Sequence, residues 1–383
     1  MTPLPSPVLA ELAAKLQSHL STTPYACSFL TQLTGGTTSF VFLGILCEPL
    51  TQQGVKDTHV IVKHAAPFAS CHTEFLIDDG RAEYEALMLN ALRNFSPPGH
   101  SSLSVKVPEL YLYNEREKLQ VIQRIPSTLP LHQTLHTLPA EHARAIGGAL
   151  GHWISAFHSL PHQSRLTEKL AQNKKARALK HYLTWTQGTQ VLDMLEAQVG
   201  LCIGEGERRA WEAAKGCAEA KLENECENNN KDMVHGDFWA GNILIPTSPS
   251  PSRPIYVIDF EATHLSSLAT DLAQFIGDLL ERYHIHPSST VQASTTELIR
   301  GFVAGYGEMS EELRWKIAIY VGVHVVNWWS RGPPGRWDVD AATRERGVEL
   351  VRKGVGWVRG GWEKDRGAFA DGPLGVLFEN GGS

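Results

Sequence analysis

Hydrophobic and polar residues follow two different patterns along this chain, and the change comes near residue 125. In the first part, runs rich in β-branched and aromatic residues, such as LTGGTTSFVFLGIL, THVIVKHAA, KVPELYLYN and KLQVIQRIP, predict short strands separated by turns. An amphipathic pattern over residues 8–20 and another that begins near Asp79 predict two helices among these strands. We therefore expect residues 1–125 to form a β-rich lobe.

From residue 126 onward the pattern is mainly helical. Apolar residues recur at helical spacing after Pro139, and further helices are predicted over 268–283, 296–306 and 311–329. The segments NILI and PIYVIDF, which flank a Ser/Pro-rich turn, instead predict a hairpin, and the Gly-rich tail from Gly354 predicts irregular structure. The expected fold class is α+β, with a β-rich lobe at residues 1–125 and a mainly helical lobe at 126–383.

Composition narrows the class of protein. A chain of 383 residues exceeds the size of most single cores, and 42% hydrophobic with 20% charged residues is ordinary for a globular protein. The formal net charge of −6 and the lack of a basic block argue against a nucleic-acid partner. The N-terminus has no signal-peptide pattern, and no apolar run reaches about 18 residues. The six cysteines are scattered, as is typical of free thiols. We therefore expect a cytoplasmic protein without a membrane partner.

The sharpest chemical signal is the sequence H-G-D at residues 235–237, followed by Asn242, Asp259 and Glu261. Phosphoryl transfer needs a carboxylate to orient or deprotonate the attacking hydroxyl, and oxygen ligands to hold Mg²⁺. We expect Asp237 to be the base and Asn242 and Asp259 to bind metal from opposite strands of the hairpin. Strand alternation would place Glu261 on the same face as Asp259, near a second ion. The alternative is structural: His235 and Asp237 cap a turn, and Asp259 ends a strand.

Two segments of the β-rich part could meet a nucleotide. Lys63 lies on a strand with apolar neighbours and needs an anionic partner, unless it is an edge-strand lysine whose ammonium group reaches water. Gly35, Gly36 and Thr37 could bring backbone N–H groups close to phosphates, or could form an ordinary hairpin turn.

The pattern H-G-D-x-x-x-x-N followed by I-D-x-E resembles the protein-kinase-like small-molecule kinases: the aminoglycoside phosphotransferase, choline kinase and methylthioribose kinase group. The resemblance extends over about residues 33–307. It implies a bilobal protein-kinase-like fold with ATP in the cleft, and Mg²⁺-dependent transfer of the γ-phosphate to a hydroxyl, or less readily an amine, of a small molecule. By position it makes Asp237 the catalytic base, Asn242 and Asp259 metal ligands, and His235 a brace of the catalytic loop. Asp271 matches a structural aspartate.

The same resemblance implies the nucleotide contacts. Lys63 would bind the α- and β-phosphates and pair with a helical carboxylate. We favour Glu83, four residues ahead of Leu87, over Glu85. The carbonyl of Gln123 and the N–H of Ile125 would hydrogen-bond to adenine.

Departures from the protein kinases favour a small-molecule acceptor. The loop has H-G-D in place of H-R-D, and Glu261 stands where protein kinases have glycine. Trp328, Trp329 and Arg331 could form part of the acceptor pocket, although tryptophans at this density are more often core residues. The competing functions are a nucleotide-binding pseudokinase that acts as a scaffold, and a peptide-directed kinase, for which the activation segment is too short. The sequence fixes neither the acceptor nor the oligomeric state.

Overall fold

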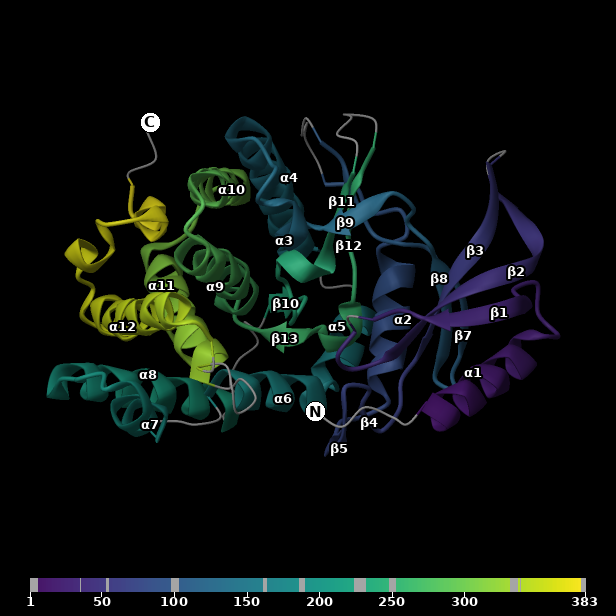
Figure 1. Ribbon diagram of the computed structural model, residues 1–383, viewed down its shortest axis with the longest axis horizontal. Coiled ribbons are helices and arrows are strands. Elements are labelled where there is room, and N and C mark those ends of the chain that lie inside the picture. Colours follow the sequence, from purple (N-terminus) through teal and green to yellow (C-terminus); the bar gives the residue numbers. More distant parts are fainter. Residues whose placement is uncertain are drawn as a thin grey trace. The chain divides into compact units, whose positions relative to one another are not determined.

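The computed structural model describes residues 6–34, 36–52, 55–97, 103–160, 164–185, 190–223, 232–247, 253–330, 337 and 339–379 (Figure 1). Packing divides the chain into two units. Unit 1 contains residues 1–95, 107–127 and 258–262, and unit 2 contains residues 96–106, 128–257 and 263–383. The short segment 258–262 brings Asp259 and Glu261 into unit 1. The lobe boundary expected at residue 125 stays a prediction.

Unit 1 is built on an antiparallel sheet of order β1-β2-β3-β8-β7. Its strands are β1 (Cys27–Gln32), β2 (Phe40–Gln52), β3 (Val55–His64), β7 (Leu110–Asn114) and β8 (Leu119–Gln123). The other elements are helix α1 (Ser6–Leu20), the hairpin of β4 (Phe68–Ala69) and β5 (His72–Leu76), helix α2 (Arg81–Ala91) and the short helix η2 (Phe260–Ala262). Each predicted element of this part is therefore present.

Alternation along β3 and β8 separates an apolar face of the sheet from a polar one. Val62 and Val121 pack into the core that also contains Leu16 and Leu20 of α1. Their neighbours Lys63 and Gln120 are paired in register and point to the opposite face. There, Gln120 Nε2 donates a hydrogen bond of 2.7 Å to the Ala82 carbonyl of α2. Lys63 thus emerges on the face that meets α2.

Unit 2 combines short strands with long helices. A four-stranded sheet has the order β6-β12-β11-β9, and β10 pairs with β13. The strands are β6 (Val105–Lys106), β9 (Thr128–Pro130), β10 (Asp232–Val234), β11 (Ile243–Pro246), β12 (Ile255–Val257) and β13 (His264–Ser266). The helices are α3 (Leu131–Thr134), α4 (Ala140–His158), α5 (Ser164–Ala171), α6 (Lys174–Trp185), α7 (Gln190–Val199), α8 (Glu205–Glu223), α9 (Ala269–Ile285), α10 (Ser289–Tyr306), α11 (Glu311–Ser330), α12 (Ala341–Glu363), η1 (Ala240–Asn242), η3 (Arg366–Phe369) and η4 (Pro373–Leu377).

The predicted hairpin and the predicted helices are confirmed. β11 and β12 pair antiparallel with Ile243 opposite Val257, and α4 begins directly after its N-cap, Pro139. Helix α4 packs on α10, and Figure 1 shows the two side by side. A Cβ atom at Gly147 or at Gly301 would lie 2.1 Å from a carbonyl oxygen of the other helix. Only glycine permits this approach of two backbones.

The prediction of an irregular tail from Gly354 is wrong. Helix α12 continues to Glu363, and two of its glycines, Gly354 and Gly361, face the neighbouring helix α11 at short range. A Cβ at Gly354 would lie 2.5 Å from Val325 Cγ2 of α11, and one at Gly361 would lie 2.7 Å from Ile319 Cγ1. The packing of α12 on α11 overrides the low helix propensity of glycine. Among the helices that the structure describes, none combines the length and the apolar character needed to cross a membrane.

Candidate active site

The H-G-D sequence forms a tight loop between β10 and η1 of unit 2. Gly236 has φ +81°, a conformation that favours glycine. The backbone N–H groups of His235 and Gly236 donate hydrogen bonds of 2.7 and 2.9 Å to the two carboxylate oxygens of Asp271 on α9. Phe238, which is fully buried, stacks on Trp153 of α4 and fixes the far side of the loop. The loop is therefore held from both sides.

Asp271 is itself held by a buried chain of hydrogen bonds. Its carboxylate lies 3.0 Å from His158 Nε2, and His158 Nδ1 lies 3.1 Å from the Tyr306 hydroxyl. His158 therefore joins Asp271 to Tyr306, with Nε2 facing the carboxylate and Nδ1 facing the hydroxyl. Burial alone would raise the pKa of Asp271, but the hydrogen bond from His158, the charges of His158 and His235, and the loop N–H groups outweigh it, so this pKa is lowered. Asp271 is therefore an anionic anchor of the loop.

The carboxylate of Asp237 is oriented by two amide side chains. Gln274 Nε2 donates a bond of 2.6 Å to Oδ1, and Asn242 Nδ2 donates a bond of 3.0 Å to Oδ2. Asn242 also donates to the Asp237 carbonyl, and the backbone N–H of Asp237 donates to His235 Nδ1 over 3.2 Å. Two side chains thus converge on this carboxylate, and one of them, Asn242, is among the predicted site residues.

Gln274 is a contact that the sequence did not reveal. It lies three residues after Asp271 on α9, and this spacing places both side chains on the same face of a helix. Glutamine has no signature in the motifs of phosphoryl transfer. Only its distance from Asp271 could have indicated that it reaches the same loop.

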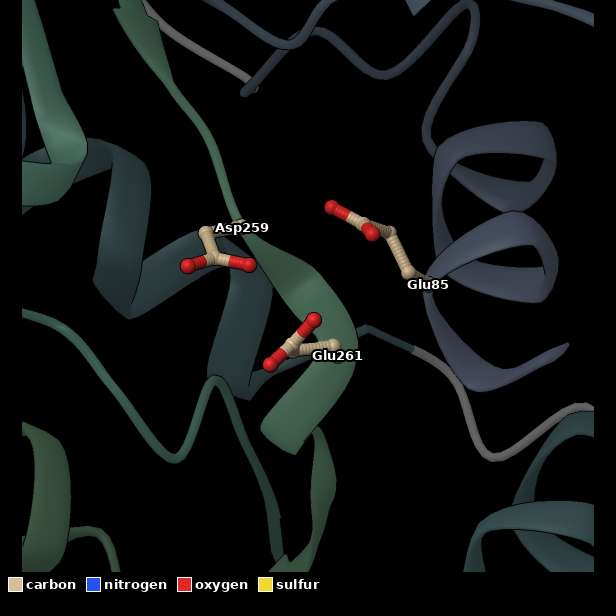
Figure 2. A group of neighbouring side chains, drawn as sticks. All are labelled: Glu85, Asp259 and Glu261. Carbon is tan, nitrogen blue, oxygen red and sulfur yellow. The ribbon is translucent and has the colours of Figure 1, made fainter. Parts of the chain in front are cut away.

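Unit 1 gathers three carboxylates around one lysine. Lys63 Nζ lies 2.8 Å from Glu85 Oε2, 2.6 Å from Asp259 Oδ1 and 3.0 Å from Glu261 Oε2. Figure 2 shows the three carboxylates, with Glu85 on α2 and the other two on the segment around η2. The side chains of Lys63, Glu85 and Glu261 are at most 10% exposed, whereas that of Asp259 is 27% exposed. We call these four residues the lysine cluster.

The predicted pairing of Lys63 with Glu83 is wrong, and Glu85 is the partner. Two residues along a helix correspond to about 200° of rotation, so the two carboxylates face different directions. Glu85 lies with Ala82 and Ala86 on the buried face of α2. Leu87, on which the choice of Glu83 rested, is only half-buried, as is Glu83 itself.

The expected alternation of Asp259 and Glu261 along a strand is also wrong. Strand β12 ends at Val257, and Glu261 lies in η2. Asp259 has φ +70°, an unusual value for a residue other than glycine. The two carboxylates reach Lys63 from the same side because the backbone turns at Asp259, not because it is extended.

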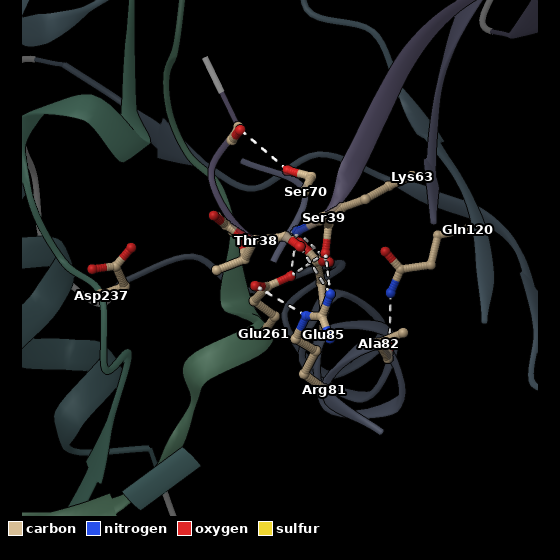
Figure 3. A network of polar contacts seen from close by, with 12 residues as sticks. Thr38, Ser39, Lys63, Ser70, Arg81, Ala82, Glu85, Gln120, Asp237 and Glu261 are labelled. Carbon is tan, nitrogen blue, oxygen red and sulfur yellow. Dashed lines mark hydrogen bonds and ion pairs between the residues drawn. The ribbon is translucent and has the colours of Figure 1, made fainter. Parts of the chain in front are cut away.

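Arg81 extends the lysine cluster. Its Nε lies 3.5 Å from Glu261 Oε1, and its guanidinium donates to the Thr38 carbonyl over 3.0 Å and to Ser39 Oγ over 3.3 Å (Figure 3). Ser39 Oγ in turn donates a bond of 2.9 Å to Glu261. The segment that begins at Gly36 is thereby tied to the cluster.

The ionisation of the three carboxylates differs. Burial raises the pKa of Asp259 to about 7, and the charge of Lys63 offsets only part of this effect. Burial also raises the pKa of Glu85. At Glu261, Lys63 and Arg81 together outweigh burial and set the pKa at about 2. The carboxylates hold the pKa of Lys63 above its ordinary value against the opposing effect of burial.

The other residues predicted to contact a nucleotide lie on two segments of the chain. The Thr37 carbonyl accepts from Cys71 N–H over 3.2 Å, while Gly35 lies outside the described residues. Gln123 ends β8, and Ile125 follows it.

The tryptophan cluster expected at the acceptor pocket is not brought together. Trp329 is buried beside Trp337, whereas Trp328 is 38% exposed and stacks on His324. Arg331 lies outside the described residues.

Known proteins resemble this chain in sequence and in fold. The model of the phosphotransferase enzyme family matches residues 74–316. The chain is 24% identical to the phosphotransferase FrzJ of Cladobotryum sp, with 96% of both chains covered. It is also 24% identical to the 4-hydroxytryptamine kinase of Psilocybe cyanescens, with 78% of this chain and 79% of that one covered. Among solved structures, wild-type aminoglycoside 2'-phosphotransferase-IIIa in complex with GDP is 12% identical, with a TM-score of 0.51 over 90% of this chain and 98% of that one. The predicted protein-kinase-like fold is confirmed.

Proposed function

Because the chain belongs to the phosphotransferase enzyme family and is a small-molecule kinase, we propose that it transfers the γ-phosphate of ATP, with Mg²⁺, to a hydroxyl group of a small molecule. The observation that carries this proposal is the orientation of Asp237. A carboxylate fixed by two amide donors on a rigid loop is suited to receive the proton of an attacking hydroxyl.

Each carboxylate oxygen of Asp237 accepts one hydrogen bond and keeps a second lone pair. Gln274 and Asn242 therefore fix the direction of the carboxylate without using all of its acceptor capacity. His235 acts indirectly. Its ring accepts a hydrogen bond from the Asp237 N–H and thereby fixes the backbone that carries the carboxylate. In this proposal Asp237 is the catalytic base and His235 is a positioning residue.

Lys63 would hold the α- and β-phosphates of the nucleotide. Glu85 holds its ammonium group in place through an ion pair of 2.8 Å. Two further sets of nucleotide contacts stay predictions. The phosphate contacts are Gly35, Gly36 and Thr37, and the adenine contacts are Gln123 and Ile125. The GDP bound to the solved aminoglycoside phosphotransferase supports the use of a nucleotide.

The residues present fit Mg²⁺ by charge and by donor type. When all three are ionised, the carboxylates of the lysine cluster exceed its two cations, Lys63 and Arg81, by one negative charge. Asp259 is its most exposed carboxylate and has a pKa of about 7, so a cation would displace a proton that it holds at neutral pH. Asn242 uses its amide nitrogen toward Asp237, which leaves its carbonyl oxygen for a metal. Asp259 and Asn242 would be the ligands, with Glu261 near a second ion; when bound, Mg²⁺ neutralises charge on the phosphates.

The test is ADP release with and without Mg²⁺, joined to mass spectrometry of the product, over a panel of hydroxyl compounds. The panel includes hydroxyindoles, because one relative is a 4-hydroxytryptamine kinase. Asp237→Asn should lower turnover by more than about a thousandfold while ATP affinity, measured by calorimetry, changes little. The matched control is Asp193→Asn on α7, whose carboxylate is 67% exposed. Equal turnover of the wild type and the Asp237 variant would refute the role of this residue.

A further inference from the structure

Lys180 of α6 contacts the amide group that orients Asp237. Its ammonium group donates a hydrogen bond of 2.5 Å to Gln274 Oε1, and Gln274 Nε2 donates a bond of 2.6 Å to Asp237 Oδ1. All three residues belong to unit 2. The amide of Gln274 therefore joins a lysine on one side to the proposed base on the other.

The two groups that contact Gln274 permit only one orientation of its amide. An ionised carboxylate only accepts hydrogen bonds, and an ammonium group only donates them. An inverted amide would place its oxygen against the Asp237 carboxylate and its NH2 group against the ammonium group of Lys180. The bond from Lys180 is also charge-assisted, and it polarises the amide so that its N–H becomes a stronger donor toward Asp237.

The side chain of Gln274 needs a second contact of this kind. It has several rotatable bonds and is half-buried, so one hydrogen bond at its end would leave other rotamers within reach. Hydrogen bonds to both ends of the same amide, one from Lys180 and one to Asp237, restrict it to a single arrangement. The direction of the Asp237 carboxylate then depends on the lysine as well as on the glutamine.

Helix α6 holds Lys180 in a fixed position because the helix is anchored near both ends. Just before its first residue, Asn173 Nδ2 donates a bond of 2.8 Å to the Thr263 carbonyl. Near its last residue, the Thr184 carbonyl accepts a bond of 2.7 Å from Asn327 Nδ2 of α11. Both asparagines are 4% exposed, so water cannot readily replace these bonds. A lysine on such a helix can determine where its partner lies.

We propose that Lys180 is a positioning residue for phosphotransfer: by holding Gln274 Oε1, it keeps the amide NH2 group directed at the carboxylate of Asp237. This inference rests on the proposed function, because it takes Asp237 as the base. Lys180 also lines a cavity of about 270 Å³ in unit 2. The competing role is therefore a direct contact with the acceptor, and in that case the contribution of Lys180 would not depend on Gln274.

A double-mutant cycle in the full chain tests the proposal, with the hydroxyl compound that the wild type phosphorylates fastest. Lys180→Met, which cannot donate, should lower kcat at least about tenfold and change KM for ATP by less than about twofold. Lys180→Arg, which keeps a charged donor, should lower kcat by less than about threefold. In the Gln274→Met background, Lys180→Met should lower kcat by less than about twofold more, because the amide through which it acts is absent. The control Lys353→Met, at a lysine of α12 paired with Glu349, should leave kcat unchanged.

A second measurement does not depend on turnover. The full chain is labelled with isotope-labelled glutamine, and the side-chain NH2 signals of Gln274 in the NMR spectrum are identified by their loss in Gln274→Met. These signals should shift in Lys180→Met, because the amide oxygen loses its donor, and should keep their positions in Lys353→Met.

The outcomes separate this inference from the proposed function. Equal kcat of the wild type and Lys180→Met, additive losses in the double variant, or Gln274 signals that Lys180→Met leaves in place would each overturn the positioning role. If the wild type releases no ADP with any compound of the panel while the Gln274 signals shift, the hold of Lys180 on the amide is supported and the failure lies in the proposed phosphotransfer.

Discussion

Replacing Asp271 by asparagine should show how strongly this residue anchors the H-G-D loop at residues 235–237. Asp271 is fully buried and accepts from the backbone N–H groups of His235 and Gly236 and from His158. An asparagine keeps the shape but turns one acceptor oxygen into a donor, which would face one of these three donors. At least one buried donor loses its partner, and the anionic charge that the network stabilises is removed.

The cost follows from the number and kind of these bonds. A hydrogen bond to a charged group contributes about 1.5–3 kcal/mol, and removing one partner of a buried ionic network costs about 3–5 kcal/mol. We expect a loss of about 3–5 kcal/mol, because the contributions of one network are not additive. With about 2 °C per kcal/mol for a unit of this size, Tm should fall by about 6–10 °C. Displacement of the loop should also lower kcat by about a hundredfold, with a smaller effect on KM for ATP.

Differential scanning fluorimetry and steady-state kinetics measure the two effects. Because the pKa of Asp271 is lowered in the folded chain, its contribution is complete above the unfolded pKa of about 3.9 and is lost as pH falls through the folded pKa. The difference in Tm should therefore be constant between about pH 6 and 8 and should shrink only below about pH 4. The exposed Asp193, paired with Arg208, gives the control, and Asp193→Asn should cost less than about 1 kcal/mol. A change in Tm below about 1 °C for Asp271→Asn would refute the anchoring role.

Three further predictions concern the lysine cluster and the glycine contacts. Glu85→Gln should lower kcat/KM for ATP at least about tenfold, because Lys63 loses a buried partner. The control Glu83→Gln should change kcat/KM by less than about threefold. Similar losses in the two variants would contradict the assignment of Glu85 as the partner of Lys63. Because the pKa of Asp259 is about 7, protons should compete with Mg²⁺ below this pH. The Mg²⁺ concentration for half-maximal ADP release should therefore rise about tenfold per pH unit below pH 7 and level off above pH 8. A concentration that does not change with pH would exclude Asp259 as a ligand. Gly354→Ala should cost about 1–3 kcal/mol in thermal unfolding, because its Cβ would lie 2.5 Å from Val325. Gly356→Ala, whose Cβ meets nothing within 4 Å, should instead stabilise by up to about 1 kcal/mol, and equal effects of the two would contradict the packing argument.

Local patterns were sufficient for the order of the elements and for the motif residues. The hairpin, the strand of Lys63 and the helix after Pro139 each follow from periodicity and turn chemistry within a few residues of sequence. The convergence of Asn242 on Asp237 also follows from their close spacing.

Features that depend on a neighbour from elsewhere in the chain were not predictable in this way. Whether Glu83 or Glu85 meets Lys63 depends on the phase of α2, whose buried face includes Ala82, Ala86 and Leu89. The two alanines beside Glu85 give a weaker apolar pattern than the half-buried Leu87 suggests. From sequence alone, Gly354 and Gly361 predict the end of a helix. In the structure they permit close packing of α12 on α11. Gln274 carries no motif, and only the position of α9 brings it to the loop.

Asp259 illustrates a conflict between folding and chemistry. It adopts a left-handed backbone conformation that glycine would adopt without strain, and without its carboxylate the charges of Lys63, Arg81, Glu85 and Glu261 would balance. Variants selected only for heat resistance would therefore drift away from aspartate at this position, toward glycine or asparagine, and would lose the ligand that the proposed reaction requires. A stabilised form of this kinase should be sought with residue 259 held fixed.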